Sequence, residues 1–279
     1  MKPAAFEMHR PRELTEALEI LARSGDEARP IAGGQSLVPM MNLRIATPAV
    51  LIDLNMVPGL SGIRREGNAI SIGAMTRQQS LLSDEMIRQD IPLMAKAAAH
   101  LGHYSTRCRG TVGGSLANAD PSSELALVAM TLGAKLTVRS ATRTRIIDAR
   151  DFFIDALKTA LEPAEILVEI AVPVAGKETR VSFHERARRH GDFAAAAAAA
   201  QLSPDGPLRV GLGALGPAPS VCERIQQAFR DGRLLQDLDE VIAEEIAGVD
   251  AIADAHTSAA YRRRLAALCL ADCIKELVA

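Results

Sequence analysis

Apolar residues in the first 57 positions follow helical and strand spacings in turn. Leu14, Leu18 and Leu21 repeat every three or four residues, a spacing that places side chains on one face of a helix. Short apolar runs on either side of this helix indicate strands, and alternating strands and helices are typical of a small parallel sheet. In chain order, the predicted elements are a first strand before residue 12, a helix over 12–22, a strand over 29–32, a loop, a helix over 37–43 and a strand over 50–54.

The middle of the chain mixes strands with helices whose starts carry recognisable signals. Thr76–Gln79 has the spacing of a capping box, and Asp120-Pro121 has the order of an N-cap followed by proline at the first helical position. Gly133 would end the helix that begins at Pro121, since glycine accepts the left-handed conformation found at helix ends. In chain order, the predicted elements are two strands within 63–74, a helix reaching residue 87, a helix over 91–101, a helix over 121–132, strands over 134–138 and 144–148, a helix over 151–157 and a strand over 166–172.

The last third of the chain predicts strands followed by helices. Apolar residues at helical spacing indicate helices over Val241–Ile246 and Tyr261–Val278. The strands before them are predicted over 181–186, 193–202 and 208–215.

Two breaks in the pattern divide the sequence into three parts. One break is Asn55–Gly59, which contains Pro58-Gly59, and the other follows Pro173. Since no low-complexity linker separates the parts, we expect them to pack as one unit. The predicted parts are 1–57, 58–173 and 174–279.

Composition and charge exclude several classes of protein. Aromatic residues make up only 3% of the chain and Trp is absent, so the core must be aliphatic. A net charge near −2 argues against a nucleic-acid partner. We expect no membrane span, because no stretch of 18 apolar residues lacks charge. The N-terminal sequence has no apolar segment of a secretory signal, so we expect a cytoplasmic protein.

The histidines and cysteines argue against a metal centre on this chain. The six histidines are scattered, and the spacing of Cys108, Cys222, Cys269 and Cys273 suits no iron–sulfur cluster. Reduced cytosolic thiols are expected instead. If the protein is redox-active, its redox centre is therefore an organic cofactor.

Two glycine-rich stretches share one arrangement of residue types. Pro30–Leu37 and Gly110–Pro121 each place Gly-Gly between apolar residues and a hydroxyl. Adjacent glycines allow close approach of the backbone, and N–H groups beside hydroxyls suit a phosphate. Neither stretch has the dinucleotide-binding or P-loop glycine spacing. Two such loops fit a ligand with two phosphates, and the candidate residues are Ala32, Gly33, Gly34, Gln35, Ser36, Leu37, Thr111, Gly113, Gly114 and Ser115.

These two stretches resemble the diphosphate-binding loops of a known family, the FAD-binding medium subunits of molybdenum hydroxylases. That family includes the flavin subunits of carbon monoxide dehydrogenase, xanthine dehydrogenase and nicotine dehydrogenase. The resemblance runs from Phe6 to Arg263 in consistent order. It is carried by AGGQSL in the first loop, LIDL at 51–54, TVGGSLANADPSSEL in the second loop, EILVEIAVP at 165–173, FHERARRHGDFA at 183–194 and HTSAAYRR at 256–263.

The resemblance implies an α+β fold of the p-cresol methylhydroxylase (PCMH) type. It implies a small parallel α/β subdomain, an antiparallel α+β subdomain, and a C-terminal three-stranded sheet with a helical bundle. It also decides one local conflict: the alanines of 194–200 favour a helix by propensity, whereas the family has a buried strand there. We therefore predict a strand.

The resemblance also implies an electron-transfer function. FAD would lie extended between the first two subdomains, with both loops on its diphosphate. A small subunit with 2Fe–2S clusters would supply electrons, and FAD would pass them to NAD, a quinone or oxygen. Molybdopterin would be on a large subunit, in a dimer of heterotrimers. The flavin would carry the chemistry, so no catalytic side chain or metal ligand is assigned to this chain.

Further cofactor contacts follow only from the resemblance. The family places a carboxylate at the position of Glu124 near the FAD sugar, and an apolar residue at the position of Leu167 against the flavin ring. His184 stands where xanthine dehydrogenases have a Lys beside the flavin; an ordinary surface histidine is the alternative. The remaining candidates are Asn118, Asp120 and Asp192, of which Asp120 could instead act only as an N-cap.

Two other functions remain open. A stand-alone FAD oxidoreductase of the same superfamily would need its own substrate cap and catalytic acid. A scaffolding subunit that has lost FAD would not need intact Gly-Gly loops.

Overall fold

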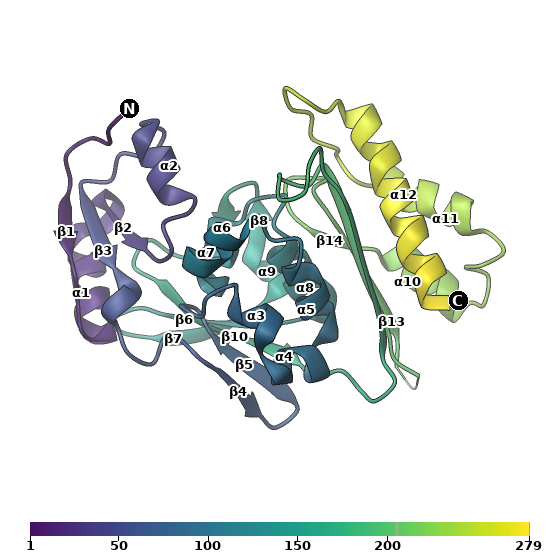
Figure 1. Ribbon diagram of the computed structural model, residues 1–279, viewed down its shortest axis with the longest axis horizontal. Coiled ribbons are helices and arrows are strands. Elements are labelled where there is room, and N and C mark those ends of the chain that lie inside the picture. Colours follow the sequence, from purple (N-terminus) through teal and green to yellow (C-terminus); the bar gives the residue numbers. More distant parts are fainter. Residues whose placement is uncertain (205, 279) are drawn as a thin grey trace.

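The computed structural model describes residues 1–204 and 206–278. Three larger sheets follow one another along the molecule, and helices pack between and beside them (Figure 1). This is the α+β architecture expected from the sequence, with a parallel sheet first and antiparallel sheets after it. Within the described residues, no helix is both long enough and apolar enough to cross a membrane.

The N-terminal part is a parallel three-stranded sheet in the order β1-β3-β2. Leu18 and Leu21 on α1 pack against Ile52 on β3, as the helical spacing predicted. The core is completed by Ile166 and Val168 from the next part of the chain. The elements are β1 (Glu7–His9), α1 (Leu14–Ser24), β2 (Ala28–Ile31), α2 (Leu37–Asn42) and β3 (Val50–Asp53), with 3-10 turns at Gly25–Glu27 and Leu54–Met56.

The second part is an antiparallel five-stranded sheet in the order β4-β5-β10-β6-β7, together with a small β8-β9 ribbon. Its helices cover one face of the sheet (Figure 1). The elements are β4 (Ile63–Glu66), β5 (Ala69–Gly73), α3 (Ser80–Ser83), α4 (Glu85–Asp90), α5 (Pro92–Ala98), α6 (Tyr104–Arg109), α7 (Val112–Asn118), α8 (Glu124–Leu132), β6 (Lys135–Arg139), β7 (Thr144–Asp148), α9 (Ala149–Phe152), β8 (Phe153–Asp155), β9 (Lys158–Thr159) and β10 (Ile166–Pro173).

Among the helix predictions in this part, those after Thr76–Gln79 and over 151–157 were wrong in detail. The helix expected after Thr76–Gln79 is two short helices, α3 and α4, and Gln79 makes no side-chain cap. Asp84 interrupts them, since its carboxylate accepts a hydrogen bond from the N–H of Ile87 and caps α4. The helix predicted over 151–157 ends at Phe152, where the chain becomes strand β8.

The C-terminal part is an antiparallel sheet in the order β11-β12-β13-β14, covered on one side by helices α10, α11 and α12. The fourth strand, which was not predicted, is a two-residue edge strand. The elements are β11 (Arg180–Arg186), β12 (Ala196–Leu202), β13 (Leu208–Gly213), β14 (Ser220–Val221), α10 (Glu223–Arg230), α11 (Leu238–Ala247) and α12 (Ala259–Val278).

The alanine run forms strand β12, which lies between β11 and β13. Alternate alanines face opposite sides of the sheet: Ala197 and Ala199 join the core of the second part, and Ala196, Ala198 and Ala200 join the core under α12. Small side chains let α8 and α12 approach the strand from its two faces. Burial on both faces therefore overrides the helix propensity of alanine.

Candidate functional site

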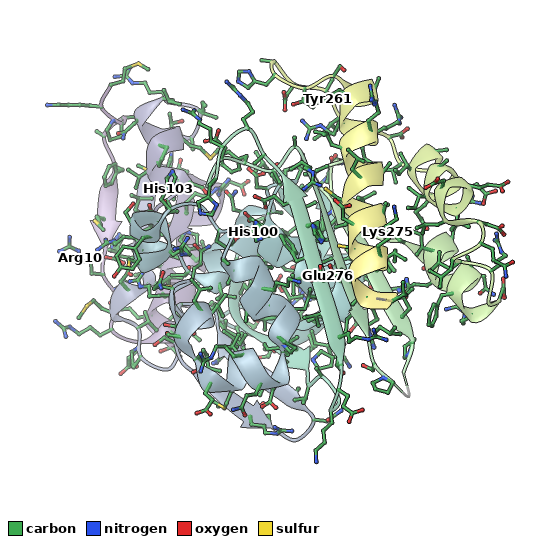
Figure 2. The ribbon with its side chains drawn as sticks, turned by 45° about the vertical axis from the view of Figure 1, so that its right-hand side comes forward. Arg10, His100, His103, Tyr261, Lys275 and Glu276 are labelled. Atoms are coloured by element: carbon green, nitrogen blue, oxygen red, sulfur yellow. The ribbon has the colours of Figure 1, made fainter. Side chains whose placement is uncertain are left out.

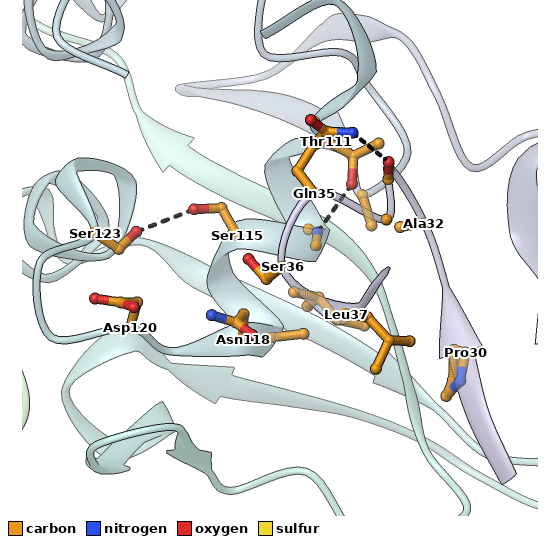
Figure 3. Close-up of a pocket in the computed structure, with 18 of the residues that line it drawn as sticks. Pro30, Ala32, Gln35, Ser36, Leu37, Thr111, Ser115, Asn118, Asp120 and Ser123 are labelled. Carbon is orange, nitrogen blue, oxygen red and sulfur yellow. Dashed lines mark hydrogen bonds between the residues drawn. The ribbon is translucent and has the colours of Figure 1, made fainter. Parts of the chain in front are cut away.

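One cleft collects nearly all the predicted ligand-binding residues. It has a volume of about 800 Å³ and lies where the loop after β2 meets α7. Among the described residues, its lining includes every predicted contact except His184. Figure 3 shows part of this lining.

The first Gly-Gly loop presents unused donors to this cleft. Within the described part of the chain, no hydrogen-bond acceptor takes the N–H groups of Gly33, Gly34, Gln35 or Ser36. Gly34 has φ +70°, a conformation that side chains rarely adopt. The Gln35 side chain folds back and donates to the Gly33 carbonyl at 3.1 Å. A run of free N–H groups in such a loop is suited to an anion.

The second Gly-Gly stretch has a different backbone arrangement from the first. It is the first turn of helix α7, capped by Thr111, whose hydroxyl accepts from the N–H of Gly114 at 3.1 Å. The N–H of Gly113 donates to the Ala74 carbonyl at 2.8 Å. Since both glycine amides are already paired, this stretch offers side chains instead: the Ser115 hydroxyl and the Asn118 amide (Figure 3).

The glycines of the two stretches are needed for close packing. A Cβ on Gly33 would lie 2.3 Å from the Arg109 carbonyl oxygen, immediately before the second stretch. A Cβ on Gly113 would lie 2.4 Å from the Cβ of Ala74. Gly33 therefore allows the first stretch to lie against the second, and Gly113 allows the second stretch to lie against the residue that follows β5.

Two side chains missed at the sequence level brace these stretches. The Asn55 amide donates to the Ala32 carbonyl at 2.9 Å and accepts from Arg77 at 2.7 Å. Arg77 also donates to the Arg109 carbonyl, so it connects the first loop to the approach to α7. At the sequence level, Asn55 falls in a boundary between two parts of the chain and Arg77 in a capping box. No local pattern indicates that their side chains connect segments so far apart in the sequence.

The turn after α7 also differs from the expectation. Helix α8 begins at Glu124 and is capped by Ser123, so Asp120 is not its N-cap. Asp120 instead accepts from the N–H of Ser122 at 2.9 Å and closes a turn. The Ser115 and Ser123 hydroxyls are 3.0 Å apart (Figure 3). Gly133 ends α8 in the left-handed conformation, as predicted.

The far end of the cleft is formed by residues from several elements. Leu167 is buried on β10, and Glu124 is half-buried at the start of α8. Asp192 comes directly after a turn at Gly191, and its carboxylate lies 3.3 Å from Arg189 Nε. Gly191 at that turn has φ +84° and lies against the ring of His103. Burial raises the pKa of Glu124 to about 7.

His184 does not reach the cleft, and its predicted flavin contact is not supported by its position. Successive strand residues face opposite sides of a sheet, so Phe183 packs on the second part while His184 faces α12. Its Nε2 lies 2.9 Å from Glu276 Oε2, on the opposite side of β11 from His100 (Figure 2).

The Glu276 cluster predicts a pH-dependent contribution to stability. Hydrogen bonds from Lys96, Ser182 and His184 lower the pKa of Glu276 to about 2. Because this pKa is below the ordinary value of about 4.5, the stabilisation is complete above pH 4.5 and is lost as pH falls toward 2. Glu276→Gln should therefore lower the melting temperature at pH 7, and the gap to the wild type should close below pH 4.5. Thermal unfolding across pH measures this, and an equal gap at all pH values would contradict it.

The geometry fits an extended dinucleotide such as FAD. The cleft is within the size range of ligand pockets. The unpaired N–H groups of the first loop would hold phosphate oxygens, with Ser115 and Asn118 opposite them. The apolar Leu167 and the polar Glu124 and Asp192 would line the rest of the ligand.

Comparisons with known proteins agree with this site. Residues 4–175 match the family model for the FAD binding domain in molybdopterin dehydrogenase, and residues 181–277 match the CO dehydrogenase flavoprotein C-terminal domain. The chain is 36% identical to the 6-hydroxypseudooxynicotine dehydrogenase complex subunit alpha of Paenarthrobacter nicotinovorans, over 95% of this chain and 92% of that protein. It is 33% identical to the carbon monoxide dehydrogenase medium chain of Afipia carboxidovorans, over 99% of this chain and 98% of that one.

Solved structures give the same result. A chain of carbon monoxide dehydrogenase from Hydrogenophaga pseudoflava superimposes with a TM-score of 0.94 at 31% identity, covering 100% of this chain and 99% of that chain. The protein is thus an oxidoreductase subunit with an FAD-binding domain. It belongs to the FAD-binding medium subunits of molybdenum hydroxylase complexes, the family of the carbon monoxide dehydrogenase medium chains.

Proposed function

We propose that this chain is the electron-transfer flavin subunit of a three-component molybdenum hydroxylase. Electrons would enter from 2Fe–2S clusters on a small subunit and leave to NAD, a quinone or oxygen. A large subunit would carry molybdopterin and bind the substrate, and two heterotrimers would form the full assembly in the cytoplasm. Bound FAD supplies two-electron storage, which connects one-electron carriers to two-electron acceptors.

The cleft is the observation that carries this proposal. The first loop has backbone N–H groups that would hold a diphosphate, and α7 and α8 carry polar side chains that would lie along the ligand. The four cysteines are free thiols, and Cys222, Cys269 and Cys273 are buried. This distribution supports a division of labour in which the iron–sulfur clusters belong to another subunit.

We also propose that the three sheets mark three structural units, with boundaries as the sequence suggests: 1–57, 58–173 and 174–279. Each unit has its own sheet, while the cores are partly shared across the boundaries.

The test is a visible absorption spectrum of the chain purified alone and again after co-expression with its genomic neighbours. Flavin bands together with copurified large and small subunits would support the proposal. Flavin without bound neighbours would favour a stand-alone flavoenzyme, and bound neighbours without flavin would leave a scaffolding subunit. Mixing the reduced complex with NAD, a quinone or oxygen would then identify the acceptor.

A further inference from the structure

The wall of the cleft contains more acidic than basic side chains, although a diphosphate ligand is itself negatively charged. Among the described lining residues, Arg29 is the only lysine or arginine. The acidic side chains of the lining are Asp26, Asp120, Glu124, Glu162, Glu165 and Asp192. A diphosphate brings further negative charge into this space, so acids close to it must be paired or protonated.

Among the described residues, most of these acids have a partner, whereas Glu124 and the exposed Asp26 do not. Glu162, Glu165 and Asp192 each lie within ion-pair distance of an arginine, at 2.5, 2.6 and 3.3 Å respectively. Asp120 accepts a backbone hydrogen bond at 2.9 Å. In the described chain, Glu124 has no cation within ion-pair distance, although it lies in the same wall.

A second buried acid, Glu185, lies close enough to Glu124 to raise its pKa. Glu185 comes from β11, and its side chain is only 6% exposed. Its Oε1 is 3.7 Å from His100 Nδ1, beyond hydrogen-bond distance, and its Oε2 has no hydrogen-bond partner among the described residues. His100, two residues after the end of α5, packs against Phe183 with ring centroids 5.0 Å apart and ring planes tilted by 48°. Glu185 is therefore a buried carboxyl group with one oxygen that has no hydrogen-bond partner among the described residues.

Some groups around Glu124 raise its pKa and others lower it. Burial raises its pKa most, and the negative charges of Glu185 and Asp120 raise it further. Its own backbone N–H at the start of α8 and the nearby His100 lower it. The result is a pKa of about 7.

We propose that Glu124 enters the flavin complex as the neutral acid and donates a hydrogen bond from its carboxyl oxygen to the bound nucleotide, with the nearby Glu185 favouring the neutral form. This inference rests on the FAD cleft described above. A protonated carboxyl can donate to a sugar hydroxyl, a ring carbonyl or a phosphate oxygen, whereas a carboxylate can only accept. Ligand binding excludes water from the cleft and adds negative charge, and both effects favour the neutral form.

The sign of the pH dependence follows from this assignment. Below pH 7 Glu124 already carries its proton, so FAD binding needs no proton. Above pH 7 the free protein must take up a proton to bind FAD, so affinity falls as pH rises. We expect the dissociation constant to rise by roughly tenfold between pH 7 and pH 8.5.

The experiment is calorimetric titration of the FAD-free, full-length chain with FAD between pH 6 and pH 9, in buffers of different ionisation heat. Wild type should take up close to one proton per FAD at the alkaline end and close to none at pH 6. Glu124→Gln mimics the neutral acid, so it should bind FAD at every pH about as tightly as wild type at pH 6, without proton uptake. Glu185→Gln removes the like charge, so affinity should begin to fall at a lower pH.

The control is Glu240→Gln on the exposed face of α11, which should behave as wild type. A wild-type affinity that is flat with pH and shows no proton uptake would overturn the proposal, even if the variants fail to fold. Weak binding by Glu124→Gln at pH 6 would also overturn it, because the carboxylate would then be the required form. Failure of FAD to bind at any pH would instead contradict the flavin site itself.

Discussion

Gly33→Ala is expected to yield a folded chain that has lost most of its FAD. The new Cβ would lie 2.3 Å from the Arg109 carbonyl oxygen and 2.8 Å from the Cα of Gly110, both of them backbone atoms that cannot rotate away. The first loop must therefore move away from α7, which misplaces the free N–H groups of Gly34 and Ser36. Overpacking of this kind costs about 1–3 kcal/mol, which corresponds to roughly 5–150-fold weaker binding.

The flavin-to-protein ratio after purification and the FAD dissociation constant measure this effect. Gly248→Ala is the matched control, because Gly248 has φ −77° and an added Cβ would have its nearest neighbour at an ordinary 3.5 Å. Circular dichroism should show the same helix content in both variants. If Gly33→Ala binds FAD within twofold of wild type, the close approach of the two stretches is not required for the site.

Arg262→Met is expected to produce the largest loss of stability. Arg262 is 3% exposed on α12, and one of its nitrogens donates to the carbonyls of Ala195 at 3.0 Å and Ala214 at 2.7 Å. Its other terminal nitrogen pairs with Asp254. Methionine fills similar space but leaves both buried carbonyls without a donor, so we expect a loss of roughly 2–4 kcal/mol in unfolding free energy.

Denaturant unfolding at pH 7 measures this loss, and Arg264→Met on the exposed side of the same helix is the control.

Arg262 also contacts the segments through which the C-terminal part is bonded to the wall of the cleft. The N–H of Ala214 donates to the Pro121 carbonyl at 3.0 Å, and the Ser122 hydroxyl donates to the Ala194 carbonyl at 3.0 Å. If Arg262→Met lost no more unfolding free energy than Arg264→Met, the carbonyls of Ala195 and Ala214 would be accepting hydrogen bonds from water in the variant.

Regular patterns in the sequence predicted most of the elements. The apolar faces of α1 and α12 and the strand runs of β3, β5 and β10 are strongly periodic, and each is found where the spacing placed it. The alanine strand β12 is different, because propensity alone favours a helix there. Its burial between two helical layers is a tertiary effect, and only the family resemblance revealed it.

The errors in the site come from contacts between distant segments. Asp120-Pro121 has a good capping pattern, but Ser123 is the residue whose hydroxyl meets the N–H of Ala126. His184 lies on the strand that borders the cleft region, yet the two-residue period of β11 turns its side chain toward α12. Sequence spacing alone identifies neither the N-cap of α8 nor the side of β11 on which His184 lies, because each depends on how a neighbouring element packs.

The two-faced strand β12 has a consequence for how the molecule comes apart. Alternate alanines complete two cores, so separating α12 from the sheet leaves the other face of the same strand without support. We therefore expect the flavin-binding and C-terminal parts to unfold in one cooperative transition. The C-terminal part would then be an integral support of the flavin domain, and a protease cut at the boundary would not release a stable fragment.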